Sequence, residues 1–433
     1  MDTASSTTIG IDYGTTNSSV ALAADSGSVR LVEFPAATGV SHSARSLLYL
    51  QQQAARAGRP VSVWTGASAI EHYLATDSFD TDVRGRLIQS LKSHLSARNL
   101  TGTEIFGRQY RLEDLVARTL GDLRRHASAA FGFEVRRAVA GRPVNFVGAH
   151  TEADNDFALG RLRRAFQQAG FTHVDFVMEQ VAAAHVYQTA EHRDETLLIG
   201  DFGGGTTDFS LLRVRPAPAR HQVLGSTGVG IAGDALDARI VRRLISPALG
   251  SESMARSLDT VLPAVPAWVY ANLERWHTLS FLRTRATMDM LRGLHKRALE
   301  PAKIAALIDI VEHDLGYRLH QSVQRVKVEL SSQPDAEFVL DTDMVHLRAP
   351  LLRTDFETWI KPELQRMERA LDELLIATKV ARQDVDHVFL TGGSSLVPAV
   401  RRIFTSRFGE ERVQSGAAFT AVAQGLALIA TRQ

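Results

Sequence analysis

The feature of this sequence that most constrains its fold is a motif that occurs twice, once in each half of the chain. IGIDYGTT begins at Ile9, and IGDFGGGTT begins at Ile199. Each copy reads as an apolar strand that carries an aspartate near its end, followed by a turn rich in glycine and threonine and a second strand. The two copies stand much farther apart than the roughly 20–50 residues of a solenoid repeat. The repeat therefore predicts two halves of related topology, with a binding cleft between them.

The chemistry of these two turns indicates a phosphate site. Glycine tolerates a positive φ and lets a ligand approach the backbone closely. Backbone N–H groups that converge in such a turn bind phosphate oxygens, and the threonine hydroxyls add further donors. The aspartates of the two strands, Asp12 and Asp201, offer hard oxygen ligands for Mg²⁺, directly or through water. One such loop would fit an ordinary turn, but two matching loops predict a bound nucleoside phosphate.

Composition and charge exclude several other classes of protein. Hydrophobic residues make up 45% and charged residues 22% of the chain, which is typical of a folded globular protein. The formal net charge of +1 gives no electrostatic basis for binding nucleic acid or a membrane. The absence of cysteine excludes disulfides and thiolate chemistry, and it fits a reducing compartment. Residues 1–8 lack the features of a signal peptide and no apolar run is long enough to cross a bilayer, so we expect a cytoplasmic protein.

Hydrophobic periodicity and proline positions suggest how the chain divides. We expect residues 1–188 to form lobe I and residues 189–433 to form lobe II. Within lobe II, residues 246–332 are predicted to form a mostly helical subdomain. A terminal helix over residues 418–430 is expected to pack back toward lobe I. In lobe I, the stretch from residue 83 to residue 95 is predicted to contain short helical pieces.

A third glycine-rich segment follows the second loop. Residues 228–233 read GVGIAG, which matches the G-x-G-x-x-G pattern of dinucleotide-binding turns, and they lie between a predicted strand and a predicted helix. Such a turn is normally the first strand-to-helix turn of its domain, whereas this one comes after two better phosphate loops. We therefore interpret it as a third wall of the same phosphate pocket, with Gly233 and Asp234 near the nucleotide.

Four motifs together resemble the nucleotide-binding domain of the DnaK-like heat-shock chaperones, within the actin and sugar-kinase superfamily. Two are the loops described above. Residues 179–184, EQVAAA, are similar to the connecting helix of that family, and residues 390–398, LTGGSSLVP, are similar to its adenosine loop. The motifs occur in the order of the family and span essentially the whole chain. The resemblance implies the α/β actin-like ATPase fold, with two duplicated lobes around an interlobe nucleotide cleft. It also implies slow hydrolysis of ATP, with ATP or ADP and Mg²⁺ as cofactors.

The resemblance also implies roles for individual residues. Asp12, Glu179 and Asp201 would surround the attacking water and hold Mg²⁺ through water. Lys92 would be the catalytic lysine, and composition supports this, because Lys92 is the only lysine before Lys296 in a chain that otherwise uses arginine there. The residues implied to contact the nucleotide are Gly14, Thr15, Thr16, Asn17, Gly203, Gly204, Gly205, Thr206, Gly233, Asp234, Lys327, Ser331, Gly392, Gly393 and Ser394.

Several positions depart from the family pattern. Val328 and Leu396 stand where the family has two arginines that sandwich the adenine, so we expect apolar stacking and altered affinity or base selectivity. Gln180 follows Glu179 where the family has proline. The sequence ends at Gln433, soon after the nucleotide-binding region, so we expect no C-terminal peptide-binding β-sandwich. In these respects the chain most resembles the truncated YegD-like branch.

Three functions are compatible with these observations. The first is a chaperone-like nucleotide switch, whose partners would be client polypeptides, co-chaperones or a separate substrate-binding partner. The second is a small-molecule kinase of the same superfamily, which would need an acceptor pocket with its own general base. The third is an ATP-dependent scaffold or filament protein. No additional acidic motif for an acceptor stands out, and this favours the nucleotide switch.

Overall fold

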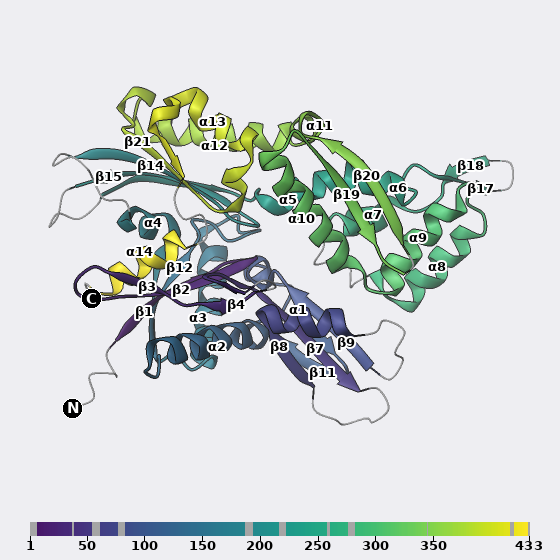
Figure 1. The fold of residues 1–433 in the computed structure, drawn as a ribbon, viewed down its shortest axis with the longest axis horizontal. Helices are drawn as coiled ribbons and strands as arrows, with labels where there is room; N and C mark the ends of the chain where they lie inside the picture. The colour runs from purple at the N-terminus through teal and green to yellow at the C-terminus, as the bar shows by residue number, and fades with distance from the viewer. Residues whose placement is uncertain are drawn as a thin grey trace.

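Two mixed β-sheets, one from each part of the chain, organise the computed structural model (Figure 1). The structure describes residues 7–36, 39–53, 61–76, 83–186, 194–215, 222–257, 260–275, 282–343, 345–415 and 420–431. Within these residues, no helix is both long enough and apolar enough to pass through a membrane.

The two sheets have the same strand order. The first sheet runs β13 (His173–Met178), β12 (Arg137–Arg142), β1 (Thr8–Tyr13), β2 (Asn17–Ala23) and β3 (Val29–Leu31), and β6 (Ala44–Arg45) also pairs with β2. The second runs β22 (Val413–Ser415), β21 (His387–Thr391), β14 (Glu195–Phe202), β15 (Thr207–Val214) and β16 (Gln222–Val229). In each sheet the central strand, β1 or β14, pairs antiparallel with the next strand and parallel with a later one. The repeated sequence motif therefore corresponds to a repeated topology.

Two helices lie between the sheets, as Figure 1 shows. They are α4 (Glu179–Val186) and α14 (Ala421–Ala430), which contact each other along their length. A buried apolar cluster joins them to both sheets and includes Val139 of β12, Ala183 of α4, Ile199 of β14 and Leu426 of α14. Helix α14 also packs on β1 and β2. Part of the predicted terminal helix, residues 418–419, lies outside the described residues.

Two long helices pack against the first sheet. They are α2 (Leu112–Phe131) and α3 (Glu152–Gln168), and their apolar residues form one core with β1, β2 and β12. Helix α3 begins with a capping box, in which the Thr151 and Asp154 side chains each accept a hydrogen bond from the backbone of the other. Helix α2 ends at Gly132, whose φ of 82° is a left-handed conformation that glycine adopts without strain.

A separate three-stranded sheet, called the small sheet below, has the order β8 (Ser62–Thr65), β7 (Leu47–Gln53) and β9 (Val83–Gln89). The same stretch of chain also contains α1 (Gly66–Ala75), η2 (Leu91–His94) and two further strand pairs, β4 (Phe34–Pro35) with β5 (Val40–Ser41) and β10 (Gly102–Ile105) with β11 (Arg108–Arg111). We expected helical pieces over residues 83–95, but β9 is a strand that pairs with β7 along its whole length. Only η2, a single 3-10 turn, is helical. Pairing with a distant strand has overridden the weak local preference.

The part of the chain after β16 is mainly helical. Its elements are α5 (Gly233–Ile240), η3 (Val241–Ile245), α6 (Ser246–Ala248), β17 (Met254–Ser257), β18 (Thr260–Pro263), α7 (Ala267–Leu273), α8 (Arg285–His295), α9 (Pro301–Glu312), α10 (Gly316–Ser332), β19 (Asp335–Asp341) and β20 (His346–Leu352). Helices predominate over residues 246–332, but the hairpin of β17 and β18 interrupts them. The remaining elements are α11 (Arg353–Trp359), α12 (Lys361–Thr378), η5 (Arg382–Asp384), η6 (Gly393–Leu396), α13 (Pro398–Phe408) and η7 (Glu410–Arg412).

Replacing Gly425 with alanine is expected to destabilise the protein by about 3 kcal/mol, because a methyl group there would lie 1.7 Å from the Ala182 backbone oxygen. Gly293 is a matched control. It lies on the exposed face of α8, where a methyl group would meet nothing within 4 Å, so Gly293→Ala is expected to stabilise by about 0.5–1 kcal/mol. Urea unfolding followed by circular dichroism checks both variants. Equal stability of the two would contradict the close packing of α14 on α4.

Candidate functional site

A cavity of about 390 Å³ contains nearly all the residues that the sequence singled out. Its lining includes both glycine-rich loops, the start of α4, η2, α10 and the turn after β21. The predicted residues that line it are Asp12, Gly14, Thr15, Thr16, Asn17, Lys92, Glu179, Asp201, Gly203, Gly204, Gly205, Thr206, Gly233, Asp234, Lys327, Gly392, Gly393 and Ser394. Ser331 is not among the lining residues, and its hydroxyl donates to the Lys327 carbonyl within α10 (3.0 Å). Segments from distant parts of the chain thus meet at one place.

The two glycine-rich loops face each other across this cavity. A methyl group on Gly204 would lie 2.4 Å from Thr16 Oγ1, so the second loop can approach the first only because it has no side chain there. A methyl group on Gly205 would lie 2.8 Å from a methyl of Val147. The glycines of the second loop therefore serve the close contact between the loops as well as access by a ligand.

Part of the hydrogen-bonding capacity of the loops is already used inside them. The Gly14 amide donates to Ser18 Oγ (3.2 Å), and the Gly203 amide donates to the Thr206 carbonyl (3.0 Å). In contrast, Thr16 Oγ1 is buried and has no hydrogen-bond partner among the described residues. Buried polar atoms are nearly always paired. A ligand oxygen in the cavity beside Thr16 would supply the missing partner.

Lys92 and Glu179 form a buried ion pair in the cavity. Lys92 Nζ lies 2.7 Å from Glu179 Oε1, and the two residues are only 7% and 8% exposed. Lys92 comes from η2, while Glu179 is the first residue of α4. Burial disfavours the ammonium, but the charges of Glu179 and Asp12 outweigh burial and raise the pKa of Lys92. The lysine therefore stays charged at neutral pH and holds the Glu179 carboxylate in place.

Three aspartates act on this ion pair: Asp208 is buried, whereas Asp12 and Asp201 are partly exposed to the cavity. Burial raises the pKa of Asp12 well above its ordinary value, and the nearby Glu179 charge adds to the effect. The same two causes raise the pKa of Asp201 to about 8 and the pKa of Asp208 to about 7. Four carboxyl groups thus share a small volume with one ammonium, and ionising all four becomes favourable only when a cation is bound beside them.

The chemistry of these carboxylates fits a hydrated divalent cation. Hard oxygen ligands suit Mg²⁺, which dehydrates reluctantly and usually keeps several waters. Among the described residues, no three acidic, histidine or cysteine side chains come close enough to hold a metal ion by themselves. Residues such as Asp12 and Asp201 would therefore reach the ion through water, or beside oxygens that a phosphate supplies.

The opposite end of the cavity is built around α10 and the turn after β21. Gly392 has a φ of 84°, and a methyl group there would lie 2.1 Å from the Phe202 carbonyl oxygen, so this position requires glycine. A methyl group on Gly233 would lie 2.9 Å from Ser394 Oγ and 3.4 Å from Lys327 Nζ. The predicted adenosine loop, residues 390–398, therefore packs against the third glycine-rich segment, residues 228–233.

Two apolar side chains line the cavity where the family pattern has arginines. Val328 of α10 is 67% exposed and Leu396 of η6 is 52% exposed. Both sequence positions were predicted to flank the base. Both side chains are therefore accessible to a ligand in the cavity.

Two further residues of the site were missed by the sequence analysis. Asp208 lies directly across the β14–β15 pair from Asp201, whereas Ser19 occupies the matching position across from Asp12. Comparing the two hairpins strand by strand would have revealed it. Arg45 lines the cavity and donates to Asn17 Oδ1 (3.4 Å) and to Gln324 Oε1 of α10 (3.5 Å). No local motif marks Arg45.

Comparison with known proteins gives a consistent result. The family model described as Hsp70 protein matches residues 8–259 and 294–431. The chaperone protein DnaK of Thermotoga petrophila is 24% identical over 426 residues, which are 97% of this chain and 58% of that protein. The DnaK of Halobacterium salinarum is 25% identical over 348 residues, which are 79% of this chain and 45% of that protein. The chain thus spans about half the length of the curated relatives it matches.

Both glycine-rich loops, the Lys92–Glu179 pair and the turn after β21 fall inside the matched residues. The match therefore includes the cavity itself as well as the framework around it. From this agreement of fold, site and comparison, the chain belongs to the Hsp70 protein family and corresponds to its DnaK-like nucleotide-binding domain.

Proposed function

We propose that this protein binds ATP and ADP with Mg²⁺ in the cavity between the two sheets, hydrolyses ATP slowly, and acts as a chaperone-like conformational switch. The observation that carries the proposal is the convergence on one cavity of both repeated loops, the Lys92–Glu179 ion pair, and Asp12 and Asp201. The family supports the same reading, because chaperone proteins named DnaK match most of this chain.

The loops are proposed to hold the phosphates. Thr15 and Thr16 on one side, and the turn from Gly203 to Thr206 on the other, line the same end of the cavity. Backbone and hydroxyl donors in such turns recognise phosphate oxygens by direction as well as charge. Asp12, Asp201 and Glu179 would hold Mg²⁺ through water. When bound, Mg²⁺ supplies a Lewis acid that neutralises phosphate charge.

Hydrolysis is proposed to depend mainly on positioning and charge stabilisation. The Glu179 carboxylate, fixed by Lys92, would orient the attacking water and accept its hydrogen bond, with Asp201 beside it. Lys92 would stabilise the negative charge on the transferred phosphoryl group. The ammonium suits this role because it is compact, buried and kept charged by its carboxylate neighbours.

The other end of the cavity is proposed to hold the nucleoside. Lys327, which lies 2.7 Å from Asp237 and beside Gly233, would face the ribose oxygens. Gly392, Gly393 and Ser394 would hold the adenosine, as the resemblance implies. Val328 and Leu396 would contact the base by apolar stacking, which is less selective than hydrogen bonding because every base offers an apolar face.

The switch is proposed to be a rotation of two lobes, residues 1–188 and residues 189–433, about the helices between the sheets. The side-chain contact from Arg45 to Gln324 joins a strand of one lobe to α10 of the other. A nucleotide that draws the two loops together would alter such contacts. Client polypeptides, co-chaperones or a separate substrate-binding partner would then respond to the nucleotide state.

The direct test measures binding and turnover on the whole chain. Isothermal titration calorimetry is expected to show ADP binding that is strengthened by Mg²⁺, and single-turnover assays with radiolabelled ATP are expected to show slow release of phosphate. Binding without any hydrolysis would overturn the ATPase proposal. Hydrolysis only with an added metabolite would favour a small-molecule kinase, and ATP-dependent sedimentation would favour a filament.

The conformational part is tested separately. Because the chain has no cysteine, spin labels can be placed at two introduced cysteines, Glu71→Cys on α1 and Arg348→Cys on β20. Their distance is expected to differ between ATP-bound and ADP-bound forms. Arg256→Cys with Arg348→Cys, both within residues 246–352, is the control pair and is expected to change less. Equal distances in all nucleotide states would contradict the switch.

A further inference from the structure

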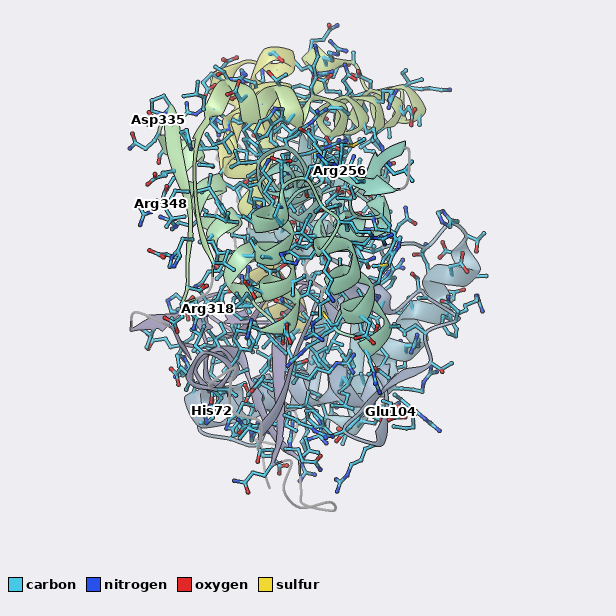
Figure 2. The ribbon with its side chains drawn as sticks, turned by 90° about the vertical axis from the view of Figure 1, so that its right-hand side faces the viewer. His72, Glu104, Arg256, Arg318, Asp335 and Arg348 are labelled. Atoms are coloured by element: carbon cyan, nitrogen blue, oxygen red, sulfur yellow. The ribbon has the colours of Figure 1, made fainter. Side chains whose placement is uncertain are left out.

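A second cavity, of about 420 Å³, lies beside the small sheet and is distinct from the nucleotide cavity. One side is formed by β9, η2 and the start of α2, and the other by the turn that leads into α10. Figure 2 faces this end of the molecule and labels Arg318 of α10 above His72 of α1 and Glu104 of β10. Its size is in the range of pockets that bind small organic ligands.

Most of the lining of this second cavity is apolar. Leucine side chains line it, among them Leu91, Leu100, Leu112 and Leu115. Two tyrosines from opposite sides also line it: Tyr73 of α1 and Tyr317 of α10 meet edge to face with ring centres 5.5 Å apart. Such a surface favours an aliphatic or aromatic group as the body of a ligand.

Two opposite charges line the same cavity. Asp314 and Arg86 both contribute to it and act on each other electrostatically. Within the described part of the chain, the Asp314 carboxylate forms no hydrogen bond or ion pair, and its charged neighbours are Arg86 and Arg283 at longer range. Arg86 donates through Nη1 to the Glu104 carbonyl (2.9 Å). Its other guanidinium nitrogens remain as donors for a ligand. Burial raises the pKa of Asp314 to about 6, so the group is ionised at neutral pH.

The position of Asp314 is fixed by its backbone. Its φ of 51° is in the left-handed region, which aspartate tolerates better than most residues. The Tyr73 hydroxyl donates a hydrogen bond to the Asp314 carbonyl oxygen across the two sides of the cavity. The carboxylate is therefore held at a defined place rather than on a free loop.

Two elements are shared between the second cavity and the nucleotide cavity. The single turn η2 gives Leu91 and His94 to the second cavity and Lys92 to the nucleotide cavity. Helix α10 gives Tyr317 to the second cavity and Lys327 to the nucleotide cavity. A ligand that shifts either element must move residues of both sites.

We propose that the second cavity binds a small zwitterion with an apolar body, of the type of an apolar α-amino acid, and that its occupancy changes nucleotide affinity. The ligand ammonium would pair with Asp314, its carboxylate with Arg86, and its side chain would pack on the leucines and tyrosines. A ligand with only one charge would bury either Asp314 or Arg86 without giving it an oppositely charged partner, and this burial costs desolvation energy. The coupling to nucleotide rests on the proposed function, whereas the binding site does not.

The binding site is tested first without nucleotide. Calorimetry on the whole chain compares L-phenylalanine with phenethylamine, which lacks the carboxylate, and with 3-phenylpropionate, which lacks the amine. We expect phenylalanine to bind at least about tenfold more tightly than either, because each lost pair is worth about 1.4 kcal/mol or more. Equal affinities of the three compounds, or no binding of phenylalanine, would overturn the proposal. This comparison uses the unchanged protein and so does not depend on the folding of a variant.

Two variants test which charged group of the ligand pairs with Asp314 and which with Arg86. Asp314→Asn is expected to weaken phenylalanine and phenethylamine and to spare 3-phenylpropionate, and Arg86→Gln is expected to do the reverse. Asp289→Asn, on the exposed surface of α8 and outside the cavity lining, is the matched control and should bind like the wild type. Loss of all three ligands in the control, or the same pattern in both cavity variants, would overturn the assignment.

The coupling is tested by titrating ADP with and without saturating phenylalanine. A change in ADP affinity is expected, and by linkage ADP must change phenylalanine affinity by the same factor. Unchanged ADP affinity in the presence of bound phenylalanine would overturn the coupling. Absence of ADP binding while phenylalanine still binds would instead count against the proposed function of the nucleotide cavity.

Discussion

Replacing Lys92 with alanine is expected to slow single-turnover ATP hydrolysis by about 10²- to 10³-fold while ADP affinity changes much less. The lysine is buried beside Glu179 and the aspartates, at the end of the cavity that both loops line. Removing it would leave the developing phosphoryl charge unstabilised and would free the Glu179 carboxylate to rotate. Rates are measured with enzyme in excess over ATP, so that product release does not mask the chemical step.

Lys303→Ala is the control for this prediction. Lys303 lies on the surface of α9, paired with Glu300 at 2.6 Å, and is not part of either cavity. Its loss is expected to leave hydrolysis unchanged. Because Lys92→Ala leaves the buried Glu179 charge unpaired, it is expected to destabilise the fold by about 3 kcal/mol, and assays are run well below its melting temperature. A hydrolysis rate equal to that of Lys303→Ala would show that Lys92 has no catalytic role.

Replacing Asp201 with asparagine is expected to abolish Mg²⁺-dependent hydrolysis and yet to stabilise the metal-free protein at pH 9. The folded pKa of Asp201 is about 8, whereas an unfolded aspartate has a pKa of about 4. The proton on this group therefore favours the folded state. The stability it contributes is complete below the unfolded pKa and is lost as pH rises through the folded pKa. Asparagine is uncharged, so the variant does not lose that stability.

Thermal unfolding in the presence of EDTA, from pH 6 to pH 9, checks this expectation. The melting temperature of the wild type is expected to fall more steeply toward pH 9 than that of Asp201→Asn, with a difference of about 2–6 °C at pH 9. Addition of Mg²⁺ with ADP is expected to stabilise the wild type and to have little effect on the variant. Asp289→Asn, an exposed aspartate, should follow the wild type throughout. A variant that melts below the wild type at pH 9 would contradict the burial of this charge.

The parts of the molecule that sequence could predict are those encoded by short local patterns. The two hairpins at Asp12 and Asp201 are visible as apolar runs around glycine and threonine, and their strands occur where expected. Strand β9 could not be found in this way, because its conformation depends on pairing with β7, which lies well before it in the chain. Local helical preference was the only signal available there, and it was misleading.

The candidate site likewise contains residues that local motifs reveal and residues that only the tertiary fold brings to the cavity. Residues inside motifs, such as Gly204 and Ser394, were found from sequence and line the cavity. Arg45 was missed because it acts through contacts with Asn17 and Gln324 that only the tertiary fold creates. Ser331 was implied by its place on α10, but its hydroxyl bonds to its own helix. Spacing along a helix indicates a face, and small rotations decide whether a given side chain reaches a cavity.

The packing of α14 has a consequence for how the chain is made. Glycine at position 10 brings β1 so close to α14 that a methyl group there would lie 2.3 Å from the Ala427 backbone nitrogen. The face of β1 therefore stays uncovered until α14, about 400 residues later in the chain, has been synthesised. Domains usually fold from the N terminus as they emerge, but here the first sheet cannot complete its packing until α14 is present. Synthesis must therefore pass α14, which contributes Val422 to the lining, before the nucleotide cavity can be completed.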